Sequence, residues 1–204
     1  PNYEVTGLRR NGYQSTGMQT TNGLVKTSKV GCVFAGHSSI LSDMAKIRLP
    51  ITSRPVQAIV SEPIKPILDT VIMSNAVHMY ISQSDKCEMV LGAGVDKYNS
   101  YAQTGSWTIP EHMVAAAIDL FPFLSQLRML RQWGGIVDTC PDASPIISKT
   151  DIKGLYFNCG WGTGGFKATP GSGHVFADLI ANDRPNPIAL PFGLKRFETG
   201  YLID

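Results

Sequence analysis

Residues 154–182 constrain the fold more than any other part of the sequence. They open with an apolar run at 155–157, which is typical of a buried strand. Four glycines follow between positions 160 and 165, and Lys167 closes this glycine-rich segment. Apolar residues at helical spacing then predict a helix with Pro170 in its first turn. The sequence therefore predicts a strand, a glycine loop and a helix in immediate succession.

A glycine loop between a strand and a helix start is suited to binding an anion, because backbone N–H groups point out of the first helical turn. Glycines also let a ligand approach the main chain closely. Lys167 would add a cation that holds a second anion or stabilises developing negative charge. The alternative is a glycine-rich turn beside a solvated lysine. We interpret the pattern as neither a P-loop nor GxGxxG, so these residues alone leave both interpretations open.

Composition limits the class of protein. The 204 residues are enough for one large domain or two small ones, and 43% hydrophobic with 17% charged residues is typical of a soluble globular chain. A net charge of +2 gives no electrostatic case for nucleic acid, and no apolar run reaches transmembrane length. The four cysteines are widely spaced, which favours reduced thiols in a cytoplasmic protein and no metal site.

Turn signals divide the first part of the chain. The Asn-Gly pairs at 11–12 and 22–23 predict a three-stranded meander, followed by a fourth strand and a short helix near residues 39–46. Further along, two strands are expected about a polar turn at 83–86. We assign Asp142 to a turn and not to acid–base chemistry.

One amphipathic helix is predicted in the middle of the chain. It should begin near Thr108, where Thr-Ile-Pro-Glu resembles a capping box. Apolar residues follow at helical spacing and predict core packing. Pro122 is expected to kink or divide this helix.

The segments GGIVDTCPDASPII at 134–147 and GLYFNCGWGTGGFKATPGSG at 154–173 resemble the C-terminal half of the beta-subunit family of heterotetrameric sarcosine oxidases. These are flavoproteins of the glycine-oxidase and D-amino-acid-oxidase type, and the resemblance runs along the whole chain. It implies a mixed α/β fold (α+β mixed). Part of an FAD/NAD(P)-binding dinucleotide domain would be joined to a substrate domain built on a mixed, largely antiparallel sheet.

The resemblance also implies domain boundaries. Residues 1–49 would form the C-terminal part of the FAD-binding domain, with its meander and strand. Residues 50–150 would form the substrate or catalytic domain, and residues 151–204 would return to the FAD-binding domain. Such a flavoprotein should begin with a strand, a GxGxxG turn and a helix. The N-terminal part of the sequence has no such unit, so we expect a fragment that lacks the nucleotide-binding first half.

The reaction implied by the resemblance is the oxidative demethylation of sarcosine to glycine, with hydride transfer to non-covalent FAD. Electrons would pass to a covalent FMN and then to oxygen, giving hydrogen peroxide. The one-carbon unit would go to tetrahydrofolate or leave as formaldehyde. Implied partners are the alpha, gamma and delta subunits, and the histidine that attaches FMN would lie outside this chain. The alternatives are glycine oxidase, dimethylglycine oxidase, D-amino-acid dehydrogenase, or an inactive interface module.

Five residues are carried over from the family. Val5 matches a strand position that contacts the adenine of FAD through its main chain, although a buried strand valine would look the same. Gly162, Thr163, Gly165 and Lys167 match the FAD-contacting glycine segment. Lys167 also matches a lysine that reaches the substrate carboxylate, and is the one catalytic residue that the resemblance implies.

Overall fold

The structure is a computed structural model that describes residues 2–203. The chain divides into two compact units, the first comprising Pro1–Ser53 and Val137–Asp204 and the second Arg54–Ile136. It enters the second unit within β5 (Thr52–Pro63) and leaves it within β9 (Met129–Thr139). The mixed α/β architecture with several antiparallel sheets confirms the predicted fold class. The changes of unit fall after residues 53 and 136, whereas the sequence analysis places boundaries after 49 and 150.

The first unit contains the predicted meander. It is an antiparallel sheet of β1 (Val5–Asn11), β2 (Gln14–Thr20) and β3 (Gly23–Lys26), in that order. Gly12 and Gly23 have φ angles of 57° and 110° at the two connections. Positive φ is the conformation that a tight hairpin turn requires and that glycine adopts without strain. Both Asn-Gly turn predictions are therefore confirmed.

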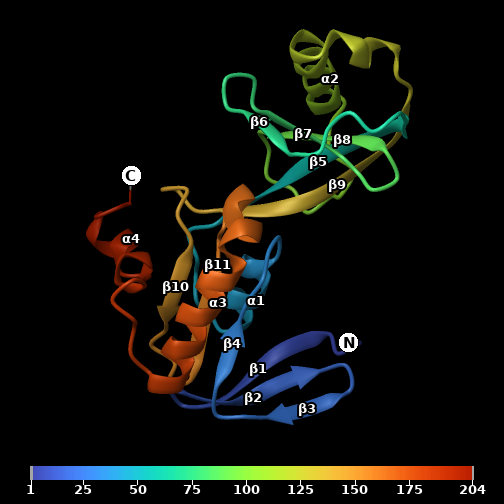
Figure 1. The fold of residues 1–204 in the computed structure, drawn as a ribbon. Helices are drawn as coiled ribbons and strands as arrows, with labels where there is room; N and C mark the ends of the chain where they lie inside the picture. Colours follow the sequence, from blue (N-terminus) through green and yellow to red (C-terminus); the bar gives the residue numbers. More distant parts are fainter. Residues whose placement is uncertain (1, 204) are drawn as a thin grey trace. The chain divides into compact units, whose positions relative to one another are not determined.

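A second sheet of the first unit has the order β10-β11-β4. The central strand, β11 (Leu155–Cys159), pairs antiparallel with β10 (Ile146–Lys149) and parallel with β4 (Val30–Cys32). All five residues of β11 are buried, as expected for a strand covered on both faces. In Figure 1 the helix α3 (Gly165–Asn182) lies along this sheet. The buried strand predicted at 155–157 is confirmed.

Alternate residues of β11 serve two cores. Leu155, Phe157 and Cys159 pack in a cluster that includes Leu41 of α1 (Ser38–Met44) and Met18 of β2. Tyr156 faces the other way and packs with residues of α3, which are Val175, Phe176 and Leu179. The side-chain alternation of a strand thus places α3 on one face of the sheet and α1 with the meander on the other. The short helix predicted near 39–46 is confirmed as α1.

The second unit is built on a five-stranded sheet of order β6-β7-β8-β5-β9. Within it β6 (Ile72–Ser74), β7 (Met79–Gln83), β8 (Glu88–Val95) and β5 pair antiparallel in succession. The predicted hairpin about a polar turn is confirmed as β7 and β8. One face of the sheet packs against α2 (Thr108–Leu120), and the core that they share contains Ile59, Met79, Ile81, Met89, Leu91, Met113 and Ala117.

The start of α2 corrects one prediction. The N-cap residue is Trp107, no side chain caps the helix, and the Glu111 N–H donates to the Trp107 carbonyl at 3.2 Å. Thr108 is therefore already inside the helix, so its hydroxyl is not in the capping position, and the predicted capping box is wrong. The effect of Pro122 is confirmed, because α2 ends at Leu120 and a short 3₁₀ helix, η1 (Pro122–Gln126), follows.

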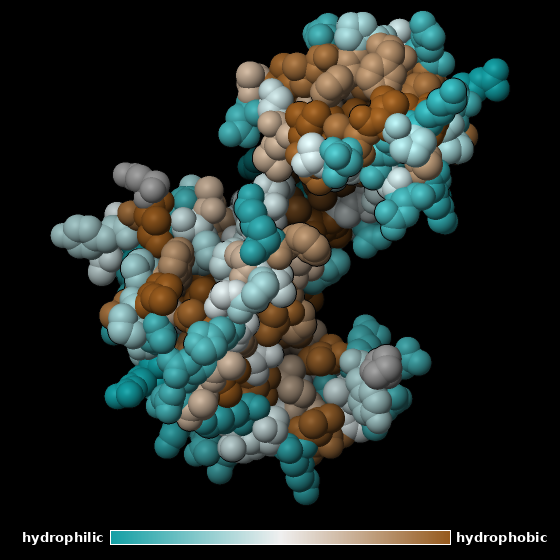
Figure 2. All heavy atoms as spheres, in the orientation of Figure 1, coloured by the Kyte–Doolittle hydropathy of each residue, from teal (hydrophilic) through white to brown (hydrophobic). Residues whose placement is uncertain are grey.

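The C-terminal segment forms a 3₁₀ turn, η3 (Leu190–Phe192), and one turn of helix, α4 (Arg196–Thr199). Among the described residues, none of the helices has the length and hydropathy needed to cross a bilayer. Hydrophobic side chains nevertheless remain exposed. Figure 2 shows them gathered over the part of the second unit that carries α2, and they include Val114, Leu120, Phe123, Met129 and Leu130.

Candidate functional site

The candidate site lies at one edge of the β10-β11-β4 sheet. Because β4 and β11 are parallel, their carboxyl ends lie at the same edge. Residues 33–37 follow β4 and lead into α1, whereas residues 160–164 follow β11 and lead into α3. Ligands of α/β proteins bind outside the carboxyl ends of parallel strands. Two loops and two helix starts therefore share the position where a ligand is expected.

Two glycines shape the second loop, because each has a positive φ and a side chain at either position would crowd a neighbouring residue. Gly160 has φ +73°, and a Cβ there would lie 2.5 Å from the Cys140 Sγ. Gly162 has φ +55°, and a Cβ there would lie 3.1 Å from the Thr139 Cγ2. Between them, Trp161 donates from Nε1 to the Asn158 Oδ1 at 2.7 Å. The loop backbone is thus held against the end of β9.

The start of α3 corrects the predicted position of Pro170. The helix begins at Gly165, five residues earlier than Pro170, and a 3₁₀ turn, η2 (Gly162–Gly164), precedes it. Lys167 therefore lies in the first helical turn and not in a loop. A proline at this point removes the hydrogen bond to the carbonyl of Phe166 and crowds that carbonyl, and it does so within the first two turns of the helix.

The first turn of α3 carries positive potential with nothing acidic to offset it. It contains no acidic residue, and its N-cap, Gly164, has no side chain. Lys167 is exposed, and among residues 2–203 the only ion pairs are between other residues. A cation at the positive end of a helix dipole is unfavourable unless an anion is bound nearby. The arrangement fits an anionic ligand.

The spacing of the loop glycines corrects one prediction, because we interpreted this loop as not being a GxGxxG motif and that interpretation is wrong. Positions 160, 162 and 165 read G-x-G-x-x-G between a strand and a helix, as in the dinucleotide fingerprint. In the described residues, however, α3 is followed by η3 and α4 and not by a second parallel strand. The βαβ unit of that fingerprint is therefore not formed around this loop.

The structure gathers four of the five predicted site residues. Gly162, Thr163, Gly165 and Lys167 form one continuous segment through η2 and the first turn of α3. Val5 lies in the separate meander sheet, where it is the first residue of β1 and pairs with Thr20. It is half-buried, and its main chain belongs to the sheet ladder.

Sequence reasoning missed two buried carboxylates near this edge. Asp138 is 2% exposed and accepts hydrogen bonds from the Ser38 N–H and the Ser53 hydroxyl. Asp142, which we assigned to a turn, does accept the Ser144 N–H at 3.3 Å, but it also pairs with Arg196 at 2.7 Å. These partners are distant in sequence, so no local pattern could have identified them.

The thiols near the loop are unsuited to nucleophilic chemistry. Burial raises the pKa of Cys32 and of Cys159 to about 12, and that of Cys140 to about 11. All four cysteines of the chain are free. Because the thiolate is the reactive form, these three buried thiols remain inert at neutral pH.

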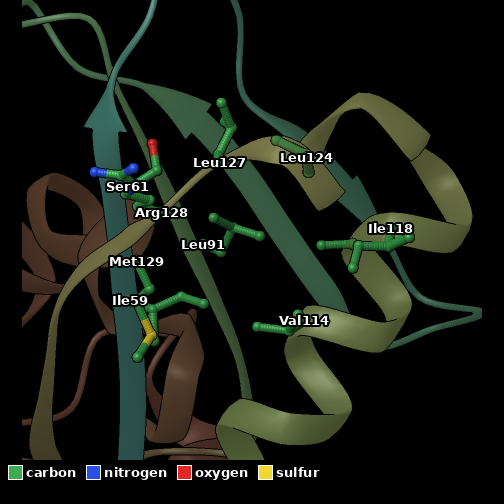
Figure 3. Close-up of a pocket in the computed structure, with 10 residues that line it drawn as sticks. Ile59, Ser61, Leu91, Val114, Ile118, Leu124, Leu127, Arg128 and Met129 are labelled. Carbon is green, nitrogen blue, oxygen red and sulfur yellow. The ribbon is translucent and has the colours of Figure 1, made fainter.

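The second unit contains a cavity of about 100 Å³ between α2 and the sheet (Figure 3). Its lining is almost entirely apolar, with Leu91 of β8 and Ile118 of α2 on opposite sides. Arg128 is the one charged residue in the lining. The other polar residue in the lining is Ser61, whose hydroxyl donates to the Glu62 carbonyl and accepts the Met89 N–H. We therefore take the glycine segment of the first unit as the candidate site.

Comparison with known proteins identifies the class to which this fold and site belong. Residues 1–179 match the FAD dependent oxidoreductase (DAO) family, so the chain belongs to that family. Within it, the chain is 54% identical over 203 residues to sarcosine oxidase subunit beta from Arthrobacter sp, and equally to that of Rhodobacter capsulatus. These alignments cover 100% of this chain and 50% and 49% of the relatives, so the chain spans about half their length. The resemblance seen in the sequence is confirmed.

The fold agrees with that of solved oxidoreductases. L-proline dehydrogenase from P. horikoshii superposes with a TM-score of 0.92 at 25% identity, covering 98% of this chain and 55% of that one. The likeness again extends over about half of the relative.

Proposed function

We propose that this chain is part of a sarcosine oxidase beta subunit, which oxidises the N-methyl group of sarcosine with FAD. The observation that carries this proposal is 54% identity over the entire chain to subunits of that name, against 25% to L-proline dehydrogenase. On this view the first unit belongs to the FAD-binding domain, and the second unit forms the substrate domain.

FAD fits the residues at the sheet edge. When bound, FAD accepts the hydride that leaves the substrate carbon. Gly162, Thr163 and Gly165 would hold the flavin through backbone N–H groups, because the glycines of this segment let a ligand approach the main chain closely. The dipole of α3 would stabilise negative charge on the reduced flavin. Val5 would contact the adenine through its main chain.

Lys167 would hold the substrate carboxylate. Its ammonium is exposed in the first turn of α3, next to the backbone groups proposed for the flavin. A cation at this position would orient the amino acid and place its N-methyl carbon at the flavin. The same charge would add to the field that favours the anionic reduced flavin.

We further propose that the complete protein works with alpha, gamma and delta subunits and with a covalently attached FMN. Electrons would reach oxygen through FMN, and tetrahydrofolate would accept the one-carbon unit. Two observations support an assembly. The relatives are named as beta subunits, and exposed hydrophobic side chains gather over α2 (Figure 2).

A second candidate is another FAD-dependent amine oxidase or dehydrogenase of the same fold. The superposition on L-proline dehydrogenase favours it, since proline and sarcosine are both secondary amino acids. Glycine oxidase, dimethylglycine oxidase and D-amino-acid dehydrogenase chemistry would use a similar carboxylate site.

Anaerobic reduction of the flavin in the complete protein by different amines tests sarcosine oxidase against the other amine oxidases and dehydrogenases. Sarcosine, L-proline, glycine, dimethylglycine and D-alanine are compared at matched concentrations, and the bleaching of flavin absorbance is followed in time. We expect sarcosine to reduce the flavin with the highest kcat/KM. Faster reduction by any other amine would replace the sarcosine assignment with that substrate. The assembly proposal fails if the complete subunit is fully active without its partners.

A further inference from the structure

We propose that Asp138 is a positioning residue that ties together the two loops at the carboxyl edge of the β10-β11-β4 sheet. Its carboxylate would hold the loop between β4 and α1 in register with the glycine segment between β11 and α3. The consequence for ligand binding rests on the proposed function, in which this edge holds the flavin and the substrate carboxylate.

Asp138 has well-formed contacts to two other segments of the first unit. Its Oδ2 accepts the backbone N–H of Ser38 at 3.0 Å, across 100 positions of sequence. Its Oδ1 accepts the hydroxyl of Ser53 at 2.6 Å. All three residues are buried, at 2%, 0% and 7% exposure. The carboxylate therefore joins the end of β9 to the first residue of α1 and to the start of β5.

The first of these hydrogen bonds replaces a missing helix cap. The N-cap residue of α1 is His37, and no side chain of the helix itself caps its first turn. The N–H groups of a first turn need an acceptor from outside the helix, and a carboxylate is favoured there. Asp138 supplies that acceptor from a distant strand, so the position of α1 and of the loop before it depends on β9.

The residue after Asp138 makes the connection to the glycine segment. Thr139 forms an isolated antiparallel bridge with Trp161, and its Cγ2 lies 3.1 Å from the point where a Cβ on Gly162 would be. Two adjacent residues of β9 thus contact both connections, Asp138 at the first residue of α1 and Thr139 in the glycine segment.

The two hydrogen-bond donors to Asp138, a backbone N–H and a serine hydroxyl, are both neutral. In residues 2–203 the ion pairs are Lys149 with Asp183 and Arg196 with Asp142. A buried carboxylate held only by neutral donors costs free energy that a neutral side chain would avoid. Asparagine at this position keeps an acceptor oxygen for the Ser38 N–H, whereas alanine removes it. The pair of substitutions therefore separates the hydrogen bond from the charge.

The test uses the complete protein with Asp138→Asn and Asp138→Ala, and Asp43→Asn as a control on the exposed side of α1. Hydrogen exchange is measured for peptides that cover residues 33–44 and 160–168. In Asp138→Ala we expect about 10-fold faster exchange in both peptides, as for the loss of a helix cap. The exchange rates of Asp138→Asn should lie nearer those of the wild-type protein, and the rates of the Asp43→Asn control should equal the wild-type rates.

A second readout connects the contact to ligand binding. The dissociation constant of acetate, which mimics the substrate carboxylate, and the kcat/KM for sarcosine are measured on the flavin-loaded variants. In Asp138→Ala we expect the dissociation constant of acetate to rise about 10-fold and the kcat/KM for sarcosine to fall about 10-fold. Both changes should be much smaller in Asp138→Asn.

Faster exchange confined to residues 33–44 would overturn the proposal, because the loops would then be uncoupled. If Asp138→Ala does not fold, the same two peptides are measured in Ser53→Ala and Asp138→Asn. Faster hydrogen exchange in both peptides would support the proposal, and faster exchange in residues 33–44 alone would overturn it. If the wild-type protein binds neither acetate nor sarcosine, the proposed function fails, while the exchange measurement still decides the role of Asp138.

Discussion

At the residue scale, the ion pair between Asp142 and Arg196 is the most completely satisfied polar contact of the chain's C-terminal segment. Both side chains are buried, at 1% and 4% exposure, and the guanidinium donates to both carboxylate oxygens, at 2.7 and 3.2 Å. Arg196 also donates to the Ser144 carbonyl, and its guanidinium lies 4.0 Å from the ring centroid of Phe197. Asp142 lies in a turn that is closed by a hydrogen bond from the Ala143 N–H to the Cys140 carbonyl, so the ion pair with Arg196 holds this turn. The same turn borders the glycine loop, because a Cβ on Gly160 would lie 2.5 Å from the Cys140 Sγ.

Replacing Arg196 with methionine should therefore destabilise the first unit. Removing one partner leaves a buried, unpaired carboxylate, which typically costs about 3–5 kcal/mol. Urea unfolding at pH 7 gives the change in free energy, and Lys195→Met, at an exposed neighbouring position, is the matched control. An effect below about 1 kcal/mol would mean that water replaces the guanidinium, as at a surface ion pair.

The stability lost in Arg196→Met should also depend on pH. Burial raises the pKa of Asp142, but hydrogen bonds from Arg196 and from the Ile203 and Ser144 N–H groups outweigh it, and the pKa lies below its ordinary value. A carboxylate with a lowered folded-state pKa stabilises the fold above its unfolded pKa of about 3.9, and this stability disappears as pH falls through the folded value. The stability difference between wild type and Arg196→Met should thus shrink below about pH 4, which urea unfolding across pH 3–7 measures. A constant difference would contradict the assignment.

Lys167 supports a third prediction at this scale. If its ammonium holds the substrate carboxylate, Lys167→Met removes a charge-assisted hydrogen bond of about 1.5–3 kcal/mol. This corresponds to roughly 10- to 150-fold in a rate or binding constant. Anaerobic flavin reduction against sarcosine concentration should show this loss, while thermal unfolding stays unchanged. Lys167→Arg should recover only part of the activity, because a planar guanidinium differs in reach from an ammonium. Equal limiting rates and affinities would remove Lys167 from the site.

At the element scale, the glycine loop offers a matched pair of substitutions. Gly160→Ala forces a Cβ to within 2.5 Å of the Cys140 Sγ at φ +73°, so we expect a loss of about 1–3 kcal/mol. Gly164→Ala meets no atom within 4 Å, at φ −90°, and should leave the stability nearly unchanged. Urea unfolding compares the two variants with wild type. Similar costs for both would mean that the loop relaxes around Gly160.

Local elements were the most predictable part of the fold. Asn-Gly pairs identify the meander turns because few residues adopt positive φ, and the apolar run at 155–157 identifies β11 because both its faces are covered. Helix starts were less predictable. Trp107 precedes α2 without a side-chain cap, and Pro170 lies in the second turn of α3. Neither helix start has a side-chain cap, so the local signals on which the two predictions depended are not the ones that these helices use.

Contacts between distant segments could not be predicted. Asp138 meets Ser38 across 100 positions, and Asp142 meets Arg196 across 54. Nothing near Asp138 or Arg196 in the sequence signals these partners, since each hydrogen bond exists only once the sheet has formed. For the site, the sequence predicted the strand, the glycines and the following helix, which a local pattern specifies. It missed the residues that support them.

At the scale of the whole molecule, the chain carries only part of what a dinucleotide requires. It spans about half the length of the sarcosine oxidase beta subunits that it matches. In the proposed site the glycine segment and α3 contact the flavin end of FAD, but in the described residues no βαβ unit is built around α3 to hold a pyrophosphate. The 204-residue chain and the complete protein should therefore differ strongly in FAD affinity.

We expect the 204-residue chain to bind FAD at least about 100-fold more weakly than the complete protein, a difference of about 2.7 kcal/mol. The physical reason is that contacts with the pyrophosphate and adenine supply much of the binding free energy of a dinucleotide, and the flavin contacts of one loop cannot replace them. Quenching of FAD fluorescence during titration measures both affinities, and Gly164→Ala in the complete protein shows whether the loop itself contributes. Equal affinities would show that the glycine segment, α3 and the meander form a complete FAD site, and that the remaining half of the protein serves catalysis or assembly and not cofactor binding.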